Sequence, residues 1–160
     1  MRTLTITDRK KIDEIIRQCK ICYVSMSADN VPYVLPMNFA LNGDTVVLHS
    51  GKNGRMWDIL HKNPAVCINW TIGDEIAWQD IRIACSYTIK SFSVLAEGLV
   101  EFTDSYEEKE RCLSLFMAQY SSREFKFNSP SVKNVGIIKV HVNQFSCKEF
   151  GAGSIRKPLQ

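Results

Sequence analysis

The sequence predicts a mainly β protein, in which one antiparallel sheet closes into a barrel flanked by a few helices. Roughly six strand-like segments are joined by turns, and no crossover of a dozen residues separates the first three. Only three segments have helical periodicity, which is too little helix to cover both faces of an open sheet. With 160 residues, 45% of them hydrophobic and 23% charged, the chain has the composition of one globular domain.

The first 50 residues are predicted to form one helix and three strands. Apolar residues recur at helical spacing between Asp8 and Cys19, and Thr7 or Asp8 is available as the N-cap. The expected strands are residues 21–27, 31–41 and 45–50. Asn42-Gly43, between the last two, is a strong hairpin signal, so the strands are antiparallel.

The remainder of the chain is predicted to alternate two helices with three strands. The expected helices are residues 55–61 and about 104–120, and the expected strands are 65–70, 94–102 and 135–142. Gly98 lies inside a strand and predicts a bulge or sharp bend. Residues 71–82 mix turn and strand signals and have no assigned element. The domain is expected to span residues 1–150, and residues 151–160 to form a tail that is frayed or lies on a partner.

Charge and hydropathy exclude several classes of protein. The 20 Lys and Arg and 17 Asp and Glu give a net charge of +3 without a basic block, so bulk nucleic-acid binding is not expected. No apolar run approaches the ~18 residues needed to cross a bilayer. No apolar signal segment follows the first three residues. We therefore expect a soluble, cytoplasmic protein with neither nucleic acid nor membrane as a partner.

The six cysteines are expected to stay reduced in the cytosol and to act as small buried hydrophobes. Cys19 and Cys22 form a C-x-x-C pair, but they lie at the C-terminal end of a helix, where the helix dipole raises a thiol pKa. A structural zinc site would need a second pair of ligands, which the sequence does not offer. Neither redox chemistry nor a metal is expected at this pair.

The strand at residues 31–41 has an unusual feature, because it contains Pro32 and Pro36. Proline cannot donate to a neighbouring strand, so this strand must lie at an edge or be bulged. Backbone groups near Pro36, Met37 and Asn38 are then free to bind a flat heterocycle with donors and acceptors. The alternative interpretation is an edge strand protected against aggregation.

A second candidate segment runs from His49 to Arg55 and passes through two glycines into the start of a helix. Glycine lets the backbone approach a ligand closely, the helix N-terminus favours an anion, and Lys52 or Arg55 can add charge-assisted hydrogen bonds. This pattern suits a phosphate, although a solvated basic turn is the alternative. Lys90 and Ser91, which follow further hydroxyl residues, could complete such an anion site.

Taken together, these segments resemble the pyridoxamine 5'-phosphate oxidase-like split barrels, specifically their nitroimidazole-resistance branch. The motifs that carry the resemblance are Tyr33-Val34-Leu35-Pro36-Met37-Asn38-Phe39, Val47-Leu48-His49-Ser50-Gly51, Gly54-Arg55, Asn63-Pro64-Ala65-Val66-Cys67, Cys85-Ser86-Tyr87 and Glu107-Glu108-Lys109. The resemblance covers residues 8–150. It implies an antiparallel FMN-binding split barrel and a homodimer with one flavin mononucleotide at each of two sites between the subunits.

The same resemblance implies where the flavin ring would lie. The backbone around Pro36, Met37 and Asn38 would face the isoalloxazine ring, and His49 and Ser50 would lie beside it.

The resemblance also implies a phosphate site near Arg55. Relatives usually have lysine where this chain has Met56, and commonly arginine where it has Lys90. Neutralisation of the phosphate would then depend on Lys52, Arg55 and Lys90, with Ser91 beside them. FAD is an alternative to FMN at such a site.

The resemblance implies a flavin-dependent oxidoreductase that reduces or oxidises a small planar molecule. The cofactor supplies the electron chemistry, and His49, with an unperturbed pKa of about 6.5, suits a role as catalytic proton donor. One alternative is a flavin store or sensor without turnover. Another is a haem-binding barrel that has lost the flavin phosphate site. Met56, at the position where relatives usually have lysine, is the residue that supports this alternative.

Overall fold

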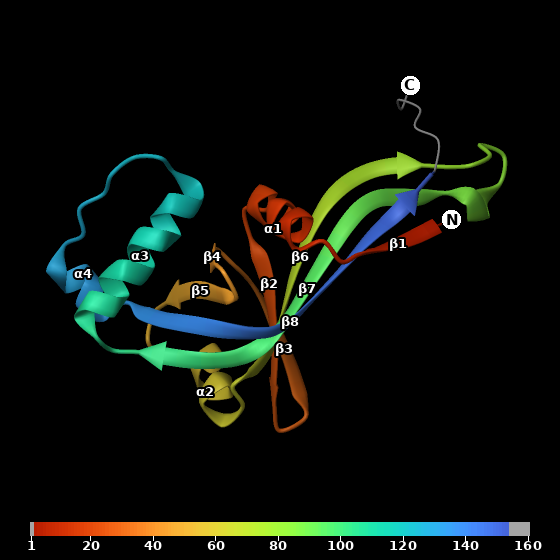
Figure 1. Ribbon diagram of the computed structural model, residues 1–160. Helices are drawn as coiled ribbons and strands as arrows, with labels where there is room; N and C mark the ends of the chain where they lie inside the picture. The colour runs from red at the N-terminus through yellow and green to blue at the C-terminus, as the bar shows by residue number, and fades with distance from the viewer. Residues whose placement is uncertain (1, 154–160) are drawn as a thin grey trace. The chain divides into compact units, whose positions relative to one another are not determined.

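The computed structural model describes residues 2–153 (Figure 1). In chain order the elements are β1 (Arg2–Ile6), α1 (Arg9–Gln18), β2 (Cys22–Ala28), β3 (Val31–Met37), β4 (Ala40–Asn42), β5 (Thr45–Ser50), α2 (Arg55–Lys62), β6 (Ala65–Ala77), a 3-10 turn (Ala84–Ser86), β7 (Thr88–Thr103), α3 (Tyr106–Tyr120), α4 (Ser129–Asn134) and β8 (Gly136–Ala152). The strands form one sheet in the order β3-β2-β6-β7-β8-β5-β4, and β1 pairs with β8. The predicted mainly β, antiparallel fold class is confirmed.

The chain divides into two compact units, and β6, β7 and β8 pass through both. Of the described residues, the first unit contains 2–19, Trp70–Leu95 and 146–153, and the second contains Lys20–Asn69 and Ala96–Phe145. Each unit has its own set of candidate residues. Most of the predicted site residues belong to the second unit.

Several elements differ from the sequence prediction. Strand β1 and helix α4 were not predicted, and β6, β7 and β8 are all longer than expected. The Gly73-Asp74 pair resembles a turn, but Gly73 is a strand residue with φ of 100°. A Cβ at Gly73 would lie 2.5 Å from the carbonyl oxygen of Lys90, so glycine is needed for close approach of β6 to β7. Strand β8 runs to Ala152, two residues beyond the expected end of the domain.

The proline-containing strand is an edge strand, as predicted. β3 ends the strand order, with β2 as its neighbour. Pro32 lies opposite Ser27 and Pro36 opposite Tyr23. Because the other side of β3 has no strand partner among the described residues, the missing N–H groups of the two prolines cost no ladder hydrogen bond there.

Helix α1 forms in the first unit as the periodicity predicts. The Asp8 carboxylate accepts a hydrogen bond from the Lys10 N–H at 3.0 Å, which caps the helix. At its end, the Cys19 thiol donates to the Ile15 carbonyl at 3.5 Å, and burial raises the pKa of this thiol. Within residues 2–153 all six cysteines are free, and no three metal-binding side chains cluster. Cys85 is exposed and Cys67 is half-buried, contrary to the expectation that all six are buried.

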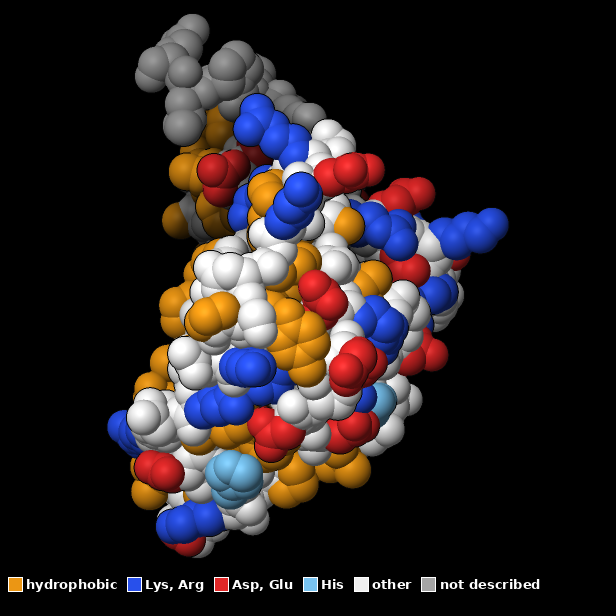
Figure 2. Space-filling model, turned by 90° about the vertical axis from the view of Figure 1, so that its left-hand side faces the viewer, with side chains coloured by type: hydrophobic (Ala, Val, Ile, Leu, Met, Phe, Trp, Pro, Cys, Tyr) orange, Lys and Arg blue, Asp and Glu red, His pale blue; other side chains and the backbone are white. Residues whose placement is uncertain are grey.

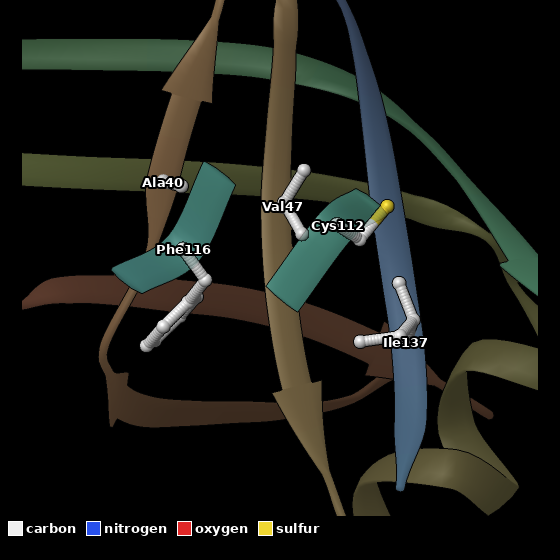
Figure 3. Packing of buried hydrophobic residues seen from close by; sticks show 5 residues of the cluster. All are labelled: Ala40, Val47, Cys112, Phe116 and Ile137. Carbon is white, nitrogen blue, oxygen red and sulfur yellow. The ribbon is translucent and has the colours of Figure 1, made fainter. Parts of the chain in front are cut away.

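The core of the second unit includes a cluster between helix α3 and the sheet. The cluster consists of Ala40, Val47, Cys112, Phe116 and Ile137, which come from β4, β5, α3 and β8 (Figure 3). Helix α3 lies beside β4 and β5, and α4 packs on α3 (Figure 1). The apolar side of α3 therefore lies on β4, β5 and β8, of which β5 carries His49 and Ser50.

Surface charge is mixed in sign, as the composition indicates. Blue and red side chains are interspersed on the face drawn in Figure 2. No helix within the described part of the chain is long and apolar enough to cross a membrane.

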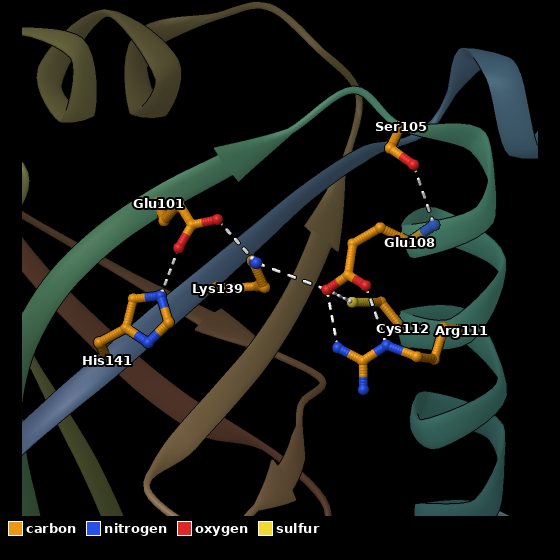
Figure 4. Close-up of polar contacts among 7 residues, drawn as sticks. All are labelled: Glu101, Ser105, Glu108, Arg111, Cys112, Lys139 and His141. Carbon is orange, nitrogen blue, oxygen red and sulfur yellow. Dashed lines mark hydrogen bonds and ion pairs between the residues drawn. The ribbon is translucent and has the colours of Figure 1, made fainter.

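An ion-pair network connects β7, β8 and α3 (Figure 4). The Lys139 ammonium lies 2.7 Å from a Glu101 oxygen and 3.4 Å from a Glu108 oxygen. His141 Nε2 lies 2.6 Å from the other Glu101 oxygen, and Arg111 binds Glu108 at 2.7 Å. The Arg111 guanidinium is the main cause that lowers the pKa of Glu108 from 4.5 to about 2.

We predict that this network makes unfolding dependent on acid pH. The lowered pKa of Glu108 means that its stabilising effect is complete above pH 4.5 and is lost as the pH falls towards 2. The Glu108→Gln variant should show a flatter decline of unfolding free energy over this window. Chemical denaturation at several pH values measures the unfolding free energy of both proteins. An identical dependence of this free energy on pH in the parent protein and the variant would contradict the stabilising role of Glu108.

A second prediction concerns Gly98, which lies in β7. A Cβ at this position would lie 2.3 Å from the carbonyl oxygen of His141. Gly98→Ala should therefore destabilise the protein by about 1–3 kcal/mol, because backbone must move to accept the methyl group. Gly51→Ala is the matched control, since the nearest atom to its Cβ is 4.0 Å away. Equal melting temperatures for the two variants would refute the close approach.

Candidate functional site

Between β3 and β4 the backbone leaves the sheet and is bound by a residue of helix α3. Phe39 is fully buried, and its N–H donates to the Tyr120 hydroxyl at 2.8 Å. That hydroxyl donates in turn to the Lys20 carbonyl at 3.1 Å, and the Asn38 side-chain amide donates to the same carbonyl at 3.3 Å. The predicted single strand at residues 31–41 is thus divided, and α3 supplies the acceptor that a neighbouring strand would otherwise give.

His49 lies near the end of β5 and faces the same helix. Its ring packs edge-on against Phe116, with 4.3 Å between the ring centroids and an interplanar angle of 88°. His49 Nδ1 is buried and has no hydrogen-bond partner among the described residues. Burial lowers the pKa of His49 from 6.5, so the imidazole is neutral at pH 7.

Two aromatic side chains of α3 connect these two parts of the site. Phe116 and Tyr120 are one helical turn apart, and their ring centroids are separated by 5.3 Å. Their contacts reach from His49 to the backbone of Phe39. We call Asn38, Phe39, His49, Phe116 and Tyr120 the aromatic site.

The predicted cations near the α2 helix have different partners. The Lys52 ammonium lies 3.3 Å from Asp104 Oδ1, whereas the exposed Arg55 guanidinium lies over the Tyr33 ring, 4.3 Å from its centroid. Gly54, the N-cap residue of α2, has φ of 102° and gives no side-chain cap. The backbone donors at this helix end are therefore not capped by the Gly54 residue.

Ser50 and Met56 serve the packing of α2 on the sheet. The Trp57 indole N–H donates to Ser50 Oγ at 2.9 Å. Ser50 thus has a structural partner, and Met56 is buried with the apolar residues of α2. The resemblance predicts lysine at position 56. The Met56 side chain instead packs in the core and adds no positive charge.

Lys90 and Ser91 lie in β7, in the first unit. There they border a hollow that is also lined by Gly73, Asp74 and Glu149. Their assignment to a flavin phosphate stays a prediction.

Phe116 and Tyr120, which sequence analysis did not select, are prominent here, and so is Lys109, which sequence analysis named only within the motif Glu107-Glu108-Lys109. All three lie on the buried stripe of α3 with Cys112, at helical spacing. The spacing was visible in the sequence. Its meaning depended on which strands the helix covers, and sequence periodicity does not specify that.

The sheet order, the proline-containing edge strand and the helix-covered site define a split β-barrel. The family model of pyridoxamine 5'-phosphate oxidase matches residues 8–149, and the chain belongs to this family. A candidate 5-nitroimidazole antibiotic resistance protein from Bacteroides thetaiotaomicron is 36% identical; the match covers 92% of this chain and 87% of that one, with a TM-score of 0.82.

Two more distant structures share the fold. The flavocytochrome Anf3 from Azotobacter vinelandii is 20% identical, with a TM-score of 0.82 over 96% of this chain and 72% of its own. A FAD- and haem-binding protein from Mycobacterium smegmatis is 14% identical, with a TM-score of 0.83 over 96% of this chain and 76% of its own. The search of curated proteins found no match.

We predict that Phe116 keeps His49 from being protonated. In Phe116→Ala, water reaches the imidazole, and the pKa of His49 should rise towards 6.5 because the charged form is better solvated. Titration of the His49 ring signals by NMR measures this pKa. Phe125→Ala, at an exposed position, is the matched control. An unchanged His49 titration in Phe116→Ala would contradict the prediction.

Proposed function

We propose that this chain is a cytoplasmic flavoprotein that binds FMN, or alternatively FAD, and transfers electrons to or from a small planar molecule. The observation that carries the proposal is the buried, unpartnered Nδ1 of His49 within the aromatic site. A buried polar atom without a partner is costly, and a ligand can supply the missing hydrogen bond. Family membership and the descriptions of the similar structures support a flavin as that ligand.

The residues present fit a flavin in several respects. A flavin ring needs hydrogen-bonding groups along its edge, and the backbone at residues 36–38 lies at the end of an edge strand that has no second strand neighbour within residues 2–153. Its phosphate needs cations, and the exposed Arg55 guanidinium has no ion pair among the described residues. When bound, the flavin would supply the electron transfer.

His49 has the properties of a proton donor or a positioning group in this proposal. It is neutral at neutral pH, so one ring nitrogen carries a proton and the other can accept one. Its contact with Phe116 fixes the ring plane, and burial excludes water from Nδ1. As a neutral ring, His49 would hold a bound planar molecule by a hydrogen bond or accept a proton from it; to act as a proton donor it would first have to take up a proton, which burial disfavours.

A homodimer is part of the proposal. Large apolar side chains are exposed on the second unit, notably Tyr23, Val34 and Leu99, which are 43%, 56% and 50% exposed. Exposed apolar side chains of this size are typical of an interface with a second subunit. We expect the flavin to lie at that interface.

A haem-binding protein is the second candidate. The flavocytochrome and the FAD- and haem-binding protein favour it, as does the unpartnered imidazole nitrogen of His49, since imidazole is a common haem ligand. A flavin store without turnover is the third.

The first experiment identifies the ligand. Purified protein is examined by absorbance, and the released ligand by mass spectrometry. Flavin absorbance supports the proposal, and a Soret band supports haem. Bleaching by a nicotinamide donor, with recovery on adding an acceptor, distinguishes an oxidoreductase from a store. A colourless monomer that binds no added FMN would overturn the proposal.

We predict that Arg55→Met weakens FMN binding by about tenfold and leaves riboflavin binding unchanged, because Arg55 would contact only the phosphate. Fluorescence quenching of each flavin gives the two affinities. Arg123→Met, which removes an exposed charge, is the control. Equal losses for FMN and riboflavin would exclude a phosphate role for Arg55.

A further inference from the structure

Lys109 occupies a position that is unfavourable for a lysine in three ways. Its side chain is only 2% exposed, although it belongs to the surface-seeking residue types. It lies in the first turn of α3, where the helix dipole opposes a positive charge. Burial is the largest cause that lowers the pKa of Lys109, and the neighbouring Lys52 ammonium is the next largest.

The partners of Lys109 compensate its charge poorly. Its ammonium lies 3.4 Å from the Lys133 carbonyl oxygen and 3.5 Å from Asp104 Oδ1, both long for contacts of an ammonium group. The same Asp104 oxygen also lies 3.3 Å from the Lys52 ammonium nitrogen. Two cations therefore share one carboxylate oxygen, and Asp104 is 89% exposed, so water competes for it.

The other acids of this helix turn are bound elsewhere. Glu107 accepts a hydrogen bond from Ser105 Oγ at 3.0 Å. Glu108 accepts from Arg111 and Lys139. Within the described residues, the Lys52–Lys109 pair therefore retains one uncompensated positive charge.

We propose that Lys52 and Lys109 form a binding site for a phosphate group, with Asp104 as the carboxylate that the phosphate displaces. A phosphate monoester carries close to two negative charges and three terminal oxygens, which can accept from both ammonium groups at once. The Asp104 carboxylate carries one negative charge and meets the two ammonium groups only at 3.3 Å and 3.5 Å through one oxygen, so it neutralises only one of the two cations. The high exposure of Asp104 lets its side chain turn into water when the phosphate arrives.

The site does not require that the proposed flavin function holds. The phosphate belongs either to the flavin itself or to a separate phosphorylated small molecule. Both sources share the same chemistry, and the experiment distinguishes them.

The test uses the full chain and four variants. Lys109→Met and Lys52→Met remove one cation each, Asp104→Asn removes the competing charge, and Lys133→Met is the control. Lys133 contributes only its backbone carbonyl to this site and its side chain is exposed, so the control changes net charge equally. Inorganic phosphate binding is measured by thermal shift at constant ionic strength against chloride. FMN and riboflavin binding are measured by fluorescence quenching after flavin removal.

Lys109→Met and Lys52→Met should weaken phosphate binding about tenfold, and Asp104→Asn should strengthen it about threefold. Lys133→Met should leave it unchanged. If the phosphate belongs to the flavin, FMN affinity changes in the same order and riboflavin affinity does not change. If it belongs to another molecule, FMN affinity is constant and the inorganic phosphate series alone responds.

The expected gain in phosphate affinity of Asp104→Asn keeps the test decisive even if a lysine variant fails to fold. Equal phosphate affinity in the parent protein and Asp104→Asn, or no phosphate binding by either, would overturn the site. A chain that binds phosphate in this pattern but binds no flavin would refute the proposed function and leave the phosphate site standing.

Discussion

The structure of the second unit depends on one backbone donor, the N–H of Phe39. This group belongs to a fully buried residue between β3 and β4, and a buried N–H without an acceptor is costly. The Tyr120 hydroxyl provides the acceptor at 2.8 Å and so fixes the end of α3 against the sheet. Because Phe116 is one turn earlier on the same face, it is placed over His49.

This arrangement makes helix α3 part of the candidate site as well as part of the core. Its apolar stripe packs on Ala40, Val47 and Ile137, and the same stripe continues into the residues that contact His49 and Phe39. Movement of the helix would therefore expose His49 Nδ1 and free the Phe39 N–H together. Packing and access to the site are linked through the same side chains, so substitutions in the stripe affect both stability and ligand contact.

Local signals in the sequence predicted most of the fold. The proline pair placed β3 at an edge, the Asp8 cap and apolar spacing gave α1, and the hairpin signal at Asn42-Gly43 joined β4 to β5. The missed parts depend on contacts distant in sequence. Strand β1 exists through pairing with β8, and Gly73 permits approach of another strand and does not make a turn. Likewise His49 was found from its motif, whereas Phe116 and Tyr120 became meaningful only once α3 was placed over the strands.

Charge placement separates a structural role from a binding role in this unit. The Glu101–Lys139–Glu108–Arg111 network pairs every cation with a carboxylate at 2.7 Å, as expected of ion pairs that stabilise the fold. Lys109 is more deeply buried yet has only long contacts, and a buried ammonium in that state destabilises a protein relative to an apolar side chain. Stability alone would favour methionine or leucine there, in line with the rest of the stripe. Local rules of this kind are broken mainly at functional positions, where an external partner supplies what the fold lacks.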